Sequence, residues 1–495
     1  MEHFDVLIVG AGLSGIGAGH HLQTDCPDKS YAILEARESM GGTWDLFRYP
    51  GIRSDSDMYT LGYSFRPWED AKAIADGPAI LSYIRQTAAE ARIDDKIRYR
   101  HRVKRASWSS ADTRWTVEAE REPSKETVRF TGNFLFLCSG YYNYAQGYTP
   151  EFPGTERFAG RIVHPQKWTE DVEYAGKRVV VIGSGATAVT LVPALAKKAA
   201  HVVMLQRSPS YVLSLPEQDP IANGLRRHLP AKVAYGITRW KNVLLGMLIF
   251  TLSRHAPELM KKLIRGGVKS QLGPDYDVDT HFKPRYNPWD QRLCLVPDAD
   301  LFKAIREGRA SVVTDAIETF TEKGLKLRSG KELEADLIVT ATGLDLLALG
   351  GIELSVDGRA VEVAKTMSYK GMMLSGVPNL ALALGYTNAS WTLKCDLTCG
   401  FVCRLLHFMD ERGYRQCVPQ NRDPSIREVP FIDFSSGYIQ RSIHKFPKQG
   451  SKTPWRLHQN YALDILALRF GALEDGTMVF SSPPPAAEAE ARAAV

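Results

Sequence analysis

The chain has 495 residues, which is enough for about three domains and a large hydrophobic core. A hydrophobic content of 44% and a charged content of 24% exclude a disordered or fibrous chain. The formal net charge of +6 is too small by itself to indicate nucleic-acid binding, so we expect no nucleic-acid partner.

The cysteines and the apolar runs favour a cytoplasmic protein. Seven cysteines lie along the chain without the spacing of a disulfide framework. Cys395, Cys399 and Cys403 recur every four positions and would share one face of a helix, which we interpret as buried small side chains rather than a metal site. We expect no signal peptide, and the apolar run over 243–252 is shorter than the about 20 residues of a membrane span.

The first 35 residues predict a dinucleotide-binding unit. A β-branched run over 5–9 leads into a glycine turn over 10–15, then a helix over 15–22 and a second strand over 31–34. The glycines allow the backbone to approach a pyrophosphate, which the N–H groups of the helix N-terminus bind. Glu35 follows the second strand, where a carboxylate accepts hydrogen bonds from a ribose. The alternative is a glycine turn in a parallel sheet that binds no ligand.

The next segments predict a loop and more strands of the same domain. Glycine, proline and aromatic residues over 41–55 indicate an ordered loop rather than a helix. Residues 70–130 predict a helix and then antiparallel strands, with Val103 and Trp108 in the first of them. Residues 134–137 predict a buried strand that ends where a nucleotide would lie, and 150–153 mark a boundary.

A second strand–turn–helix unit begins at 179–182, and in its turn the third glycine is replaced by Ala188. Its second strand, over 202–205, is followed by Arg207, at about the place where the first unit has Glu35. An arginine there would pair with a 2′-phosphate, which a carboxylate would repel. The first unit therefore predicts FAD and the second predicts NADP, unless Arg207 is only a surface charge.

These units predict an α/β fold with two Rossmann-like dinucleotide-binding domains, the NADP domain inserted into the FAD domain. The strand predicted over 335–343 would return the chain to the first domain. The predicted parts are 1–148 (first part of the FAD domain), 149–334 (NADP domain), 335–480 (second part of the FAD domain, covering the active site) and 481–495 (a disordered tail).

A basic segment lies inside the predicted NADP domain. Residues 226–270 carry ten lysines and arginines and a single acid, Glu258, together with the apolar run over 243–252. This composition is typical of helices that lie on an anionic membrane surface or pack in an oligomer. A solvated basic face over a buried helix is the simpler alternative.

Two nucleotides indicate hydride transfer from NADPH to a flavin, and the flavin's other neighbours decide how the reduced flavin then reacts. A disulfide reductase needs a redox cysteine pair, yet residues 42–44 contain no cysteine and the NADP domain contains no Cys-x-x-Cys. The remaining reaction for the reduced flavin is the activation of oxygen. A fixed cation beside the flavin would favour an anionic, nucleophilic peroxide, and arginine suits this role because it stays charged and presents several donors.

The stretch from Phe158 to Thr169, with Gly160, His164 and Trp168 at the motif spacing, resembles the fingerprint of Baeyer–Villiger flavin monooxygenases. The loop over 41–55 resembles their second flavin motif, and further stretches extend the resemblance over nearly the whole chain. It implies an enzyme that uses FAD, NADPH and O2 to convert ketones to esters, and that also S-oxygenates thioamides or sulfides. Thr169 departs from the usual residue after the fingerprint tryptophan.

The resemblance also implies the site residues. Arg292 would stabilise a peroxyflavin, Asp55 would pair with Arg292, and His164 would couple the domains. Gln291 departs from the lysine of many members, so a preference for NADPH would depend more on Arg207 and Ser208. The predicted cofactor contacts are Gly10, Gly12, Ser14, Gly15, Glu35, Gly42, Thr43, Trp44, Asp45, Leu46, Arg53, Ser54, Asp55, Val103, Gly183, Ser184, Gly185, Ala186, Thr187, Ala188, Val189, Arg207 and Ser208.

Three other functions stay open. A flavin monooxygenase acting mainly on sulfur or nitrogen would share both nucleotide units, and so would an oxidase-like flavoprotein that uses NADPH and releases hydrogen peroxide. A nucleotide-sensing scaffold without catalysis is the third. Neither the substrate nor the oligomeric state follows from the sequence.

Overall fold

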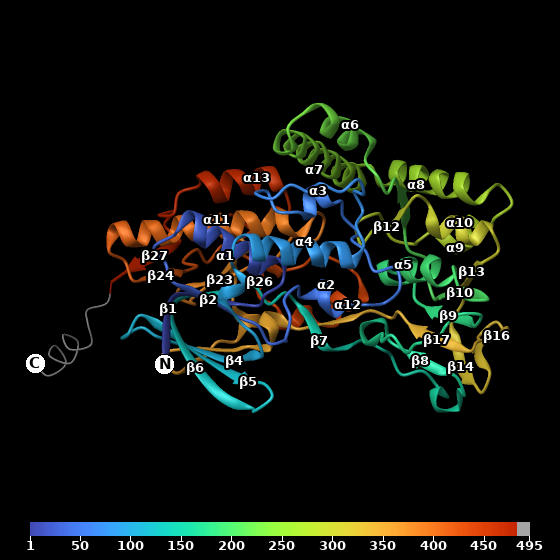
Figure 1. Cartoon of the computed structure of the whole chain (residues 1–495), viewed down its shortest axis with the longest axis horizontal. Helices are drawn as coiled ribbons and strands as arrows, with labels where there is room; N and C mark the ends of the chain where they lie inside the picture. The colour runs from blue at the N-terminus through green and yellow to red at the C-terminus, as the bar shows by residue number, and fades with distance from the viewer. Residues whose placement is uncertain (483–495) are drawn as a thin grey trace, which may run out of the picture.

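The structure is a computed structural model that describes residues 1–482 (Figure 1). The disordered tail predicted over 481–495 therefore falls, from residue 483 on, outside the described residues. Ser481 contradicts the predicted start of that tail, because it pairs with Gln416 at the end of strand β27 (Met478–Ser481).

Strand β1 (Glu2–Val9) lies at the centre of the first sheet, parallel to β2 on one side and to β6 on the other. Its residues Val6–Val9 are buried, because both faces of the sheet are covered, and this accounts for the unbroken apolar run. The strand order is β20-β19-β4-β5-β6-β1-β2-β3, and β23 also pairs with β6. The other bounds are β2 (Tyr31–Leu34), β3 (Ile97–Arg98), β4 (His101–Ser109), β5 (Arg114–Arg121), β6 (Glu126–Leu137), β19 (Glu353–Val356), β20 (Arg359–Ala360) and β23 (Leu380–Leu382).

Helices α1 (Leu13–Asp25), α4 (Gly77–Glu90) and α11 (Trp391–Arg412) cover one face of this sheet (Figure 1). On the other face Trp108 and Trp115, from the antiparallel strands β4 and β5 of the same sheet, pack in one cluster with Leu7 of β1. The predicted first unit is confirmed, with a helix that begins at Leu13 rather than Gly15. The loop predicted over 41–55 is wrong in one detail, because residues 43–46 form the single helical turn α2 (Thr43–Leu46).

The second sheet is wholly parallel, in the order β13-β10-β9-β17-β8, and lies beside the first (Figure 1). The prediction that residues 335–343 return to the first domain is wrong, because strand β17 pairs with β9 and β8 of the second sheet. The fold class, with two Rossmann-like units, is confirmed. The bounds are β8 (Arg161–Val163), β9 (Arg178–Ile182), β10 (His201–Gln206), β13 (Ala310–Thr314), β17 (Leu337–Thr340), the helices α5 (Ala186–Leu195) and α10 (Asp300–Arg306), and the hairpin strands β14 (Ile317–Thr321), β15 (Gly324–Leu327) and β16 (Glu332–Glu334).

The chain crosses between the two sheets along a pair of antiparallel strands. Strand β7 (Tyr142–Gly147) leaves the first sheet and β18 (Leu344–Leu346) returns to it. The two strands pair with each other, Leu344 with Gly147 and Leu346 with Tyr142. The true return is therefore β18, after which the chain joins the first sheet at β19.

The basic segment folds into helices at the top of the molecule in Figure 1. These are α6 (Pro220–His228), α7 (Ala231–His255) and α8 (Pro257–Leu272), followed by α9 (Val278–Phe282). Two short strands flank them, β11 (Val212–Leu215) and β12 (Cys294–Pro297). Within residues 1–482 no helix is both long and apolar enough to cross a membrane.

The C-terminal part packs α11 and several short elements over the first sheet. Cys395, Cys399 and Cys403 are buried free thiols on α11, as expected for small core side chains. In residues 1–482 no cluster of three or more histidine, cysteine or acidic side chains has the geometry of a metal site. The remaining elements are α3 (Met58–Leu61), β21 (Ser368–Tyr369), β22 (Met373–Leu374), β24 (Gln416–Pro419), β25 (Glu428–Pro430), α12 (Gly437–Gln440), β26 (Lys448–Gly450), α13 (Tyr461–Ile465) and the π-helical turn 466–470 after α13.

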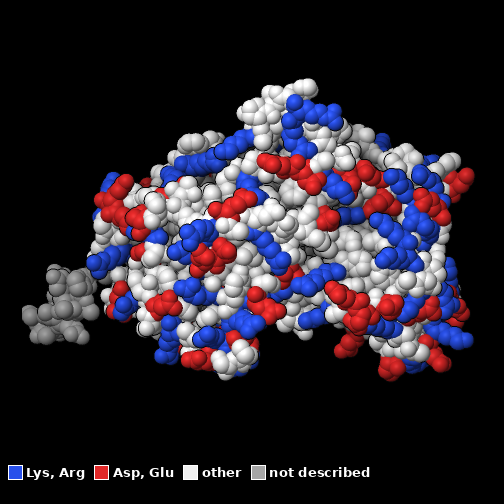
Figure 2. All heavy atoms as spheres, viewed as in Figure 1, with Lys and Arg blue, Asp and Glu red and all other residues white. Residues whose placement is uncertain are grey.

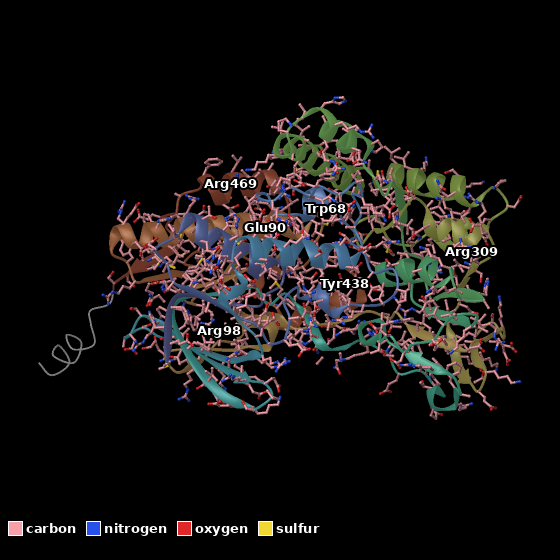
Figure 3. The ribbon with its side chains drawn as sticks, viewed as in Figure 1. Trp68, Glu90, Arg98, Arg309, Tyr438 and Arg469 are labelled. Carbon is pink, nitrogen blue, oxygen red and sulfur yellow. The ribbon has the colours of Figure 1, made fainter. Side chains whose placement is uncertain are left out.

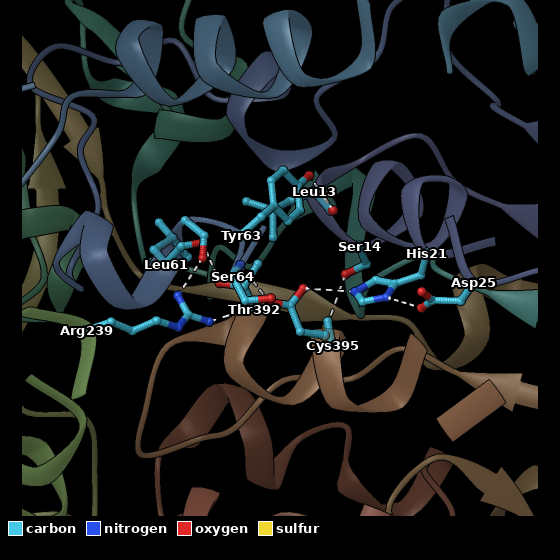
Figure 4. A network of polar contacts seen from close by, with 12 residues as sticks. Leu13, Ser14, His21, Asp25, Leu61, Tyr63, Ser64, Arg239, Thr392 and Cys395 are labelled. Carbon is cyan, nitrogen blue, oxygen red and sulfur yellow. Dashed lines mark hydrogen bonds and ion pairs between the residues drawn. The ribbon is translucent and has the colours of Figure 1, made fainter. Parts of the chain in front are cut away.

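A buried arginine joins α7 to the first domain. The Arg239 guanidinium donates to the carbonyl oxygens of Tyr59 and Gly62, each at 2.8 Å, and lies 3.5 Å from the Asp396 carboxylate. Figure 4 shows Arg239 at one end of this line of contacts, with His21 and Asp25 at the other end. Burial opposes the charged form of His21, but its contacts with Asp25 and Asp396 outweigh this and raise the pKa of His21 to about 9.

Replacing Arg239 by leucine should lower the free energy of unfolding by about 3–5 kcal/mol, because it leaves buried carbonyl groups without donors and weakens the pairing of a buried carboxylate. Urea titration followed by circular dichroism measures this. Arg254→Leu is the matched control, since Arg254 makes an exposed ion pair with Asp290 that is worth less than about 1 kcal/mol. Equal losses in the two variants would contradict the role of the buried contacts.

Candidate active site

A cavity of about 1340 Å³ extends from the first glycine turn to the second. This exceeds the usual size of a pocket for one small molecule, which is about 300–1,000 Å³. Both Rossmann-like units, the aromatic loop over 41–55 and the segment around Arg292 line the cavity. The carboxyl ends of β1 and β9 open into it, where ligands bind in sheets of this kind.

The first turn can approach a ligand only because it is made of glycines. Gly10 has φ +102°, and a Cβ atom there would lie 2.7 Å from the carbonyl oxygen of Cys138. A Cβ atom on Gly15 would lie 1.8 Å from the carbonyl oxygen of Gly10. Gly15 therefore serves the packing of helix on strand, and it does not line the cavity.

Glu35 lies at the carboxyl end of β2 with its carboxylate held in place. The backbone N–H groups of Ala11 and Arg37 donate to its two oxygens at 2.7 and 2.8 Å. Burial raises the pKa of Glu35, although these hydrogen bonds act in the opposite direction. The oxygens retain free lone pairs at the cavity wall, as an acceptor of ribose hydroxyls requires.

Most predicted cofactor residues line the cavity, and four do not. Gly15, Ala188 and Val189 pack inside the two units. Asp45 is buried and forms ion pairs with Arg37 at 2.7 Å and Arg85 at 3.1 Å. The predicted residues at the wall are Gly10, Gly12, Ser14, Glu35, Gly42, Thr43, Trp44, Leu46, Arg53, Ser54, Asp55, Val103, Gly183, Ser184, Gly185, Ala186, Thr187, Arg207, Ser208 and Arg292.

The second turn is open toward the cavity. No protein atom lies within 4 Å of the position of a Cβ on Gly185. The Ser184 hydroxyl donates to the carbonyl oxygen of Ser208 at 3.1 Å, which ties the turn to the segment after β10. Arg207 is exposed at the wall and makes no ion pair within residues 1–482. Its positive charge is therefore available to an anionic ligand.

Arg292 and Asp55 meet although they are far apart in the chain. One guanidinium nitrogen of Arg292 lies 2.6 Å from an Asp55 oxygen, and the other donates to the Thr387 carbonyl oxygen at 3.1 Å. Burial alone would lower the pKa of Arg292, but Asp55 and the neighbouring tyrosines raise it above its ordinary value. The guanidinium is therefore a permanent cation, and 29% of its side chain remains exposed to the cavity.

Aromatic side chains surround this cation, and sequence reasoning assigned them no role. Tyr141, Tyr142 and Tyr438 line the cavity near Arg292, and Tyr438 lies near the centre of the molecule (Figure 3). The Trp391 indole N–H donates to the predicted residue Ser14 at 2.7 Å. These residues come from three distant segments, so no local pattern could assign them to one site.

His164 lies on the link between the two sheets. Its ring packs against Gly147 of β7 so closely that a Cβ atom there would lie 2.0 Å from it. Burial lowers the pKa of His164 below its ordinary value, so the ring is neutral. Nε2 then donates to the Gly343 carbonyl oxygen at 3.1 Å, and Nδ1 accepts from the Gln166 N–H at 3.2 Å. His164 thus fastens both crossing segments to its own loop.

The cavity has two places that are suited to a dinucleotide, one at each glycine turn. Each end has a glycine turn followed by a helix, with Gly12 and Gly185 as the N-caps of α1 and α5. Neither cap makes a side-chain hydrogen bond, so the first N–H groups are free for a phosphate. The aromatic and apolar walls between the turns are suited to flat rings.

Comparisons with known proteins agree with this geometry. A family described as flavin-binding monooxygenase-like matches residues 54–225, and one described as an NAD(P)-binding Rossmann-like domain matches residues 8–75. The FAD-containing monooxygenase EthA of Mycobacterium tuberculosis is 56% identical over 98% of this chain and 99% of its own length. The probable FAD-binding monooxygenase AlmA of Acinetobacter baylyi is 47% identical over 97% and 96%. The chain belongs to the family of FAD-containing monooxygenases.

Solved structures show the same fold. An oxidised steroid monooxygenase bound to NADP has a TM-score of 0.77 at 21% identity, covering 97% of this chain and 100% of the other. An open structure of cyclohexanone monooxygenase has a TM-score of 0.76 at 18% identity with the same coverage. At such low identity these structures support the fold alone.

His164→Ala should leave FAD bound but slow oxygenation several-fold, because it releases both crossing segments without touching the first glycine turn. FAD content from absorbance and turnover of the same preparation measure this. His164→Gln, which can still donate to Gly343, should recover part of the rate. Purification of His164→Ala without FAD would instead show that the histidine maintains the first domain.

Proposed function

We propose that the protein is an NADPH- and O2-dependent Baeyer–Villiger monooxygenase that converts ketones to esters and also S-oxygenates thioamides or sulfides. The observation that carries this proposal is the permanent cation of Arg292, which Asp55 holds in the wall of a cavity that two glycine turns also line. A cyclohexanone monooxygenase has the same fold, so the fold is compatible with a ketone as substrate.

We assign one of the two nucleotides to each Rossmann-like unit. Glu35 in the first unit suits the ribose of FAD, and Arg207 in the second suits the 2′-phosphate of NADPH. Ser208 and the turn over 183–187 would complete the NADPH site, with modest discrimination against NADH because Gln291 stands where many relatives have lysine. In this division the FAD domain comprises 1–148 and the part after β18, and the NADP domain lies between them.

FAD, when bound, takes a hydride from NADPH and delivers one oxygen atom of O2 to the substrate. The protein's own side chains then determine where the negative charge that develops during oxygen transfer is stabilised. Arg292 places a fixed positive charge beside the reacting oxygen and holds it there through two contacts, so no reorganisation is needed as charge develops. Tyr141, Tyr142 and Tyr438 line the cavity near Arg292, where their rings would keep bulk water from the reacting oxygen.

The rival functions differ in their products. An enzyme acting mainly on sulfur or nitrogen would form a sulfoxide or N-oxide and leave ketones unchanged, and an oxidase-like flavoprotein would form only hydrogen peroxide. Arg292 favours the ketone reaction over both, because a cation stabilises the anionic, nucleophilic form of the oxygen donor. A location in the cytoplasm is part of the proposal, since all seven cysteines are free thiols.

The test is aerobic NADPH turnover by the FAD-loaded protein with linear and aryl ketones, measuring ester and hydrogen peroxide together. We expect ester in proportion to the NADPH consumed. Arg292→Ala should lower ester formation by about 100-fold or more, as loss of an oxyanion-stabilising donor does elsewhere. Arg254→Ala is the matched control. Peroxide without ester from the wild type would contradict the proposal and favour the oxidase or the sulfur-oxidising enzyme.

We further propose that the face formed by α7, α13 and the turn 466–470 binds an anionic membrane surface. Trp240 of α7 contacts Tyr461 of α13, with ring centres 5.8 Å apart, so the two helices form one face. Phe470 is 74% exposed there. Figure 2 shows uncharged atoms at the top of the molecule with lysines and arginines beside them. The other exposed apolar side chains of this face are Val233, Ile237, Leu244, Leu248, Leu463 and Leu466.

The charge of this segment indicates whether the face binds a lipid membrane or a second copy of the chain. The segment 226–270 has ten basic residues and one acid. Arg239 is buried and four others pair with carboxylates, so within residues 1–482 the basic residues of the segment without an ion pair are Arg226, Arg227, Lys232, Lys262 and Lys269. Two copies meeting at this face would bring like charges together, whereas an anionic bilayer attracts each basic side chain by about 1 kcal/mol near its surface. An amphipathic helix bordered by basic residues is the usual form of such a contact.

The full-length holoenzyme should float with vesicles of phosphatidylcholine and phosphatidylglycerol at low salt, and several-fold less with phosphatidylcholine alone. Replacing both Leu244 and Leu248 by glutamate should abolish flotation. Val429→Glu, which changes an exposed apolar residue on β25, is the control. Absence of flotation, together with a concentration-dependent dimer in sedimentation velocity, would instead assign this face to self-association.

A further inference from the structure

The strongest unassigned feature near the cavity is a buried group of a tyrosine, an aspartate and a lysine. The Tyr386 hydroxyl donates to Asp464 at 2.6 Å, and the Lys394 ammonium lies 2.8 Å from the same Asp464 oxygen. Asp464 and Lys394 are each only 5% exposed. A buried ion pair of this kind holds its helices in fixed positions, because separating the charges leaves one of them unpaired in a poorly polar environment.

This group fixes the loop that contacts Arg292. The carbonyl oxygen that accepts from the Arg292 guanidinium belongs to Thr387, the residue after Tyr386. The same loop is held at two further points by Gln459: the Thr387 N–H donates to its side chain at 3.3 Å, and the Asn388 amide donates to its carbonyl oxygen at 2.8 Å. Three hydrogen bonds therefore connect the loop to the segment over 459–464.

Two observations support a contribution of these hydrogen bonds to the position of the loop. Gln459 has φ +49°, a left-handed conformation that a residue with a side chain adopts only where its surroundings impose it. A chamber of about 40 Å³, enough for a water molecule, lies behind Tyr141 and Tyr386 and borders Thr387. The loop has space to move into this chamber if its hydrogen bonds are removed.

We propose that Asp464, together with Lys394, Tyr386 and Gln459, positions Arg292 for the oxygenation step. The carboxylate of Asp464 anchors Tyr386 to α11 and α13, and the anchored loop presents the Thr387 carbonyl to the guanidinium. Asp55 fixes one side of the cation and this loop fixes the other. Asp464 acts through Arg292, so it is a positioning residue. The inference rests on the role proposed for Arg292.

The chain contains a matched control. In a second group of the same composition, the Tyr369 hydroxyl donates to Asp475 at 2.6 Å, and Lys370 lies 3.2 Å from the same carboxylate. Tyr369 is also fully buried, and neither it nor Asp475 lines the cavity. Tyr386→Phe and Tyr369→Phe therefore remove the same kind of hydrogen bond, near the cavity and away from it.

The first variant is Tyr386→Phe in the FAD-loaded full chain. The anaerobic rate of flavin reduction by NADPH should be unchanged, while the share of NADPH that ends as hydrogen peroxide rather than ester should rise by about two- to ten-fold, the range for one lost hydrogen bond. Hydrogen–deuterium exchange over 384–393 should be faster with and without FAD, because the loop loses its hydrogen bond to Asp464 and holds the Thr387 N–H less firmly against Gln459. Tyr369→Phe should change neither the peroxide share nor exchange in that peptide.

The double variant Lys394→Met, Asp464→Leu removes both buried charges at once, so no unpaired charge destabilises the fold, and it should reproduce the effects of Tyr386→Phe. An unchanged peroxide share with unchanged exchange over 384–393 in both variants would overturn the inference. Equal effects from Tyr369→Phe would do the same, since they would show a general loss of stability. If the wild type forms no ester, the proposed function fails, and exchange together with the total peroxide yield still decides whether Asp464 positions the loop.

Discussion

The two passages of the chain between the sheets are paired with each other, and the rest of the molecule depends on that pairing. Strands β7 and β18 run side by side, so the chain passes in both directions between the two sheets at one place, and both units line one cavity. His164 fastens this link through Gly147 and Gly343. Hinges in enzymes that close around ligands are a few residues in loops or at the ends of elements, which is the kind of segment found at this link. The fingerprint stretch thus contacts both crossing segments, while the groups suited to chemistry lie elsewhere along the cavity.

Two arginines show how surroundings determine the use of the same side chain. Arg239 is 6% exposed, and its guanidinium donates to backbone carbonyl oxygens of the first domain. Its role is therefore to attach α7 to that domain. Arg292 has one carboxylate and one carbonyl partner and keeps part of its surface in the cavity. The first is fully satisfied by the protein, whereas the second still has donors to offer. Composition cannot separate the two, because both are arginines in segments of mixed character.

Local patterns predicted the nucleotide units well, because glycine turns, short β-branched strands and the acid after β2 all lie within 35 residues. The sheet to which β17 belongs was predicted wrongly. An apolar run has the same pattern in either sheet, and tertiary packing determines which strands it pairs with. Asp45 was assigned to the cofactor by its place in the loop, yet its ion pairs with Arg37 and Arg85 turn it inward. Arg292 could be chosen only by resemblance, because its partner Asp55 is remote in the chain. Tyr386 and Asp464 carry no local signal at all.

The insertion of one unit into the other has a consequence for biosynthesis. A ribosome completes β6 at Leu137 and the whole second sheet by Thr340, whereas β23, which pairs with β6, begins only at Leu380. The helix α11, which covers the face of the first sheet next to α1, is made later still. All strands of the second sheet have been synthesised by Thr340, so the second unit can fold while the first still has an uncovered apolar face. The nascent first domain is therefore the part of this chain most exposed to aggregation and most in need of a chaperone, and FAD binding at its glycine turn would be late rather than early in maturation.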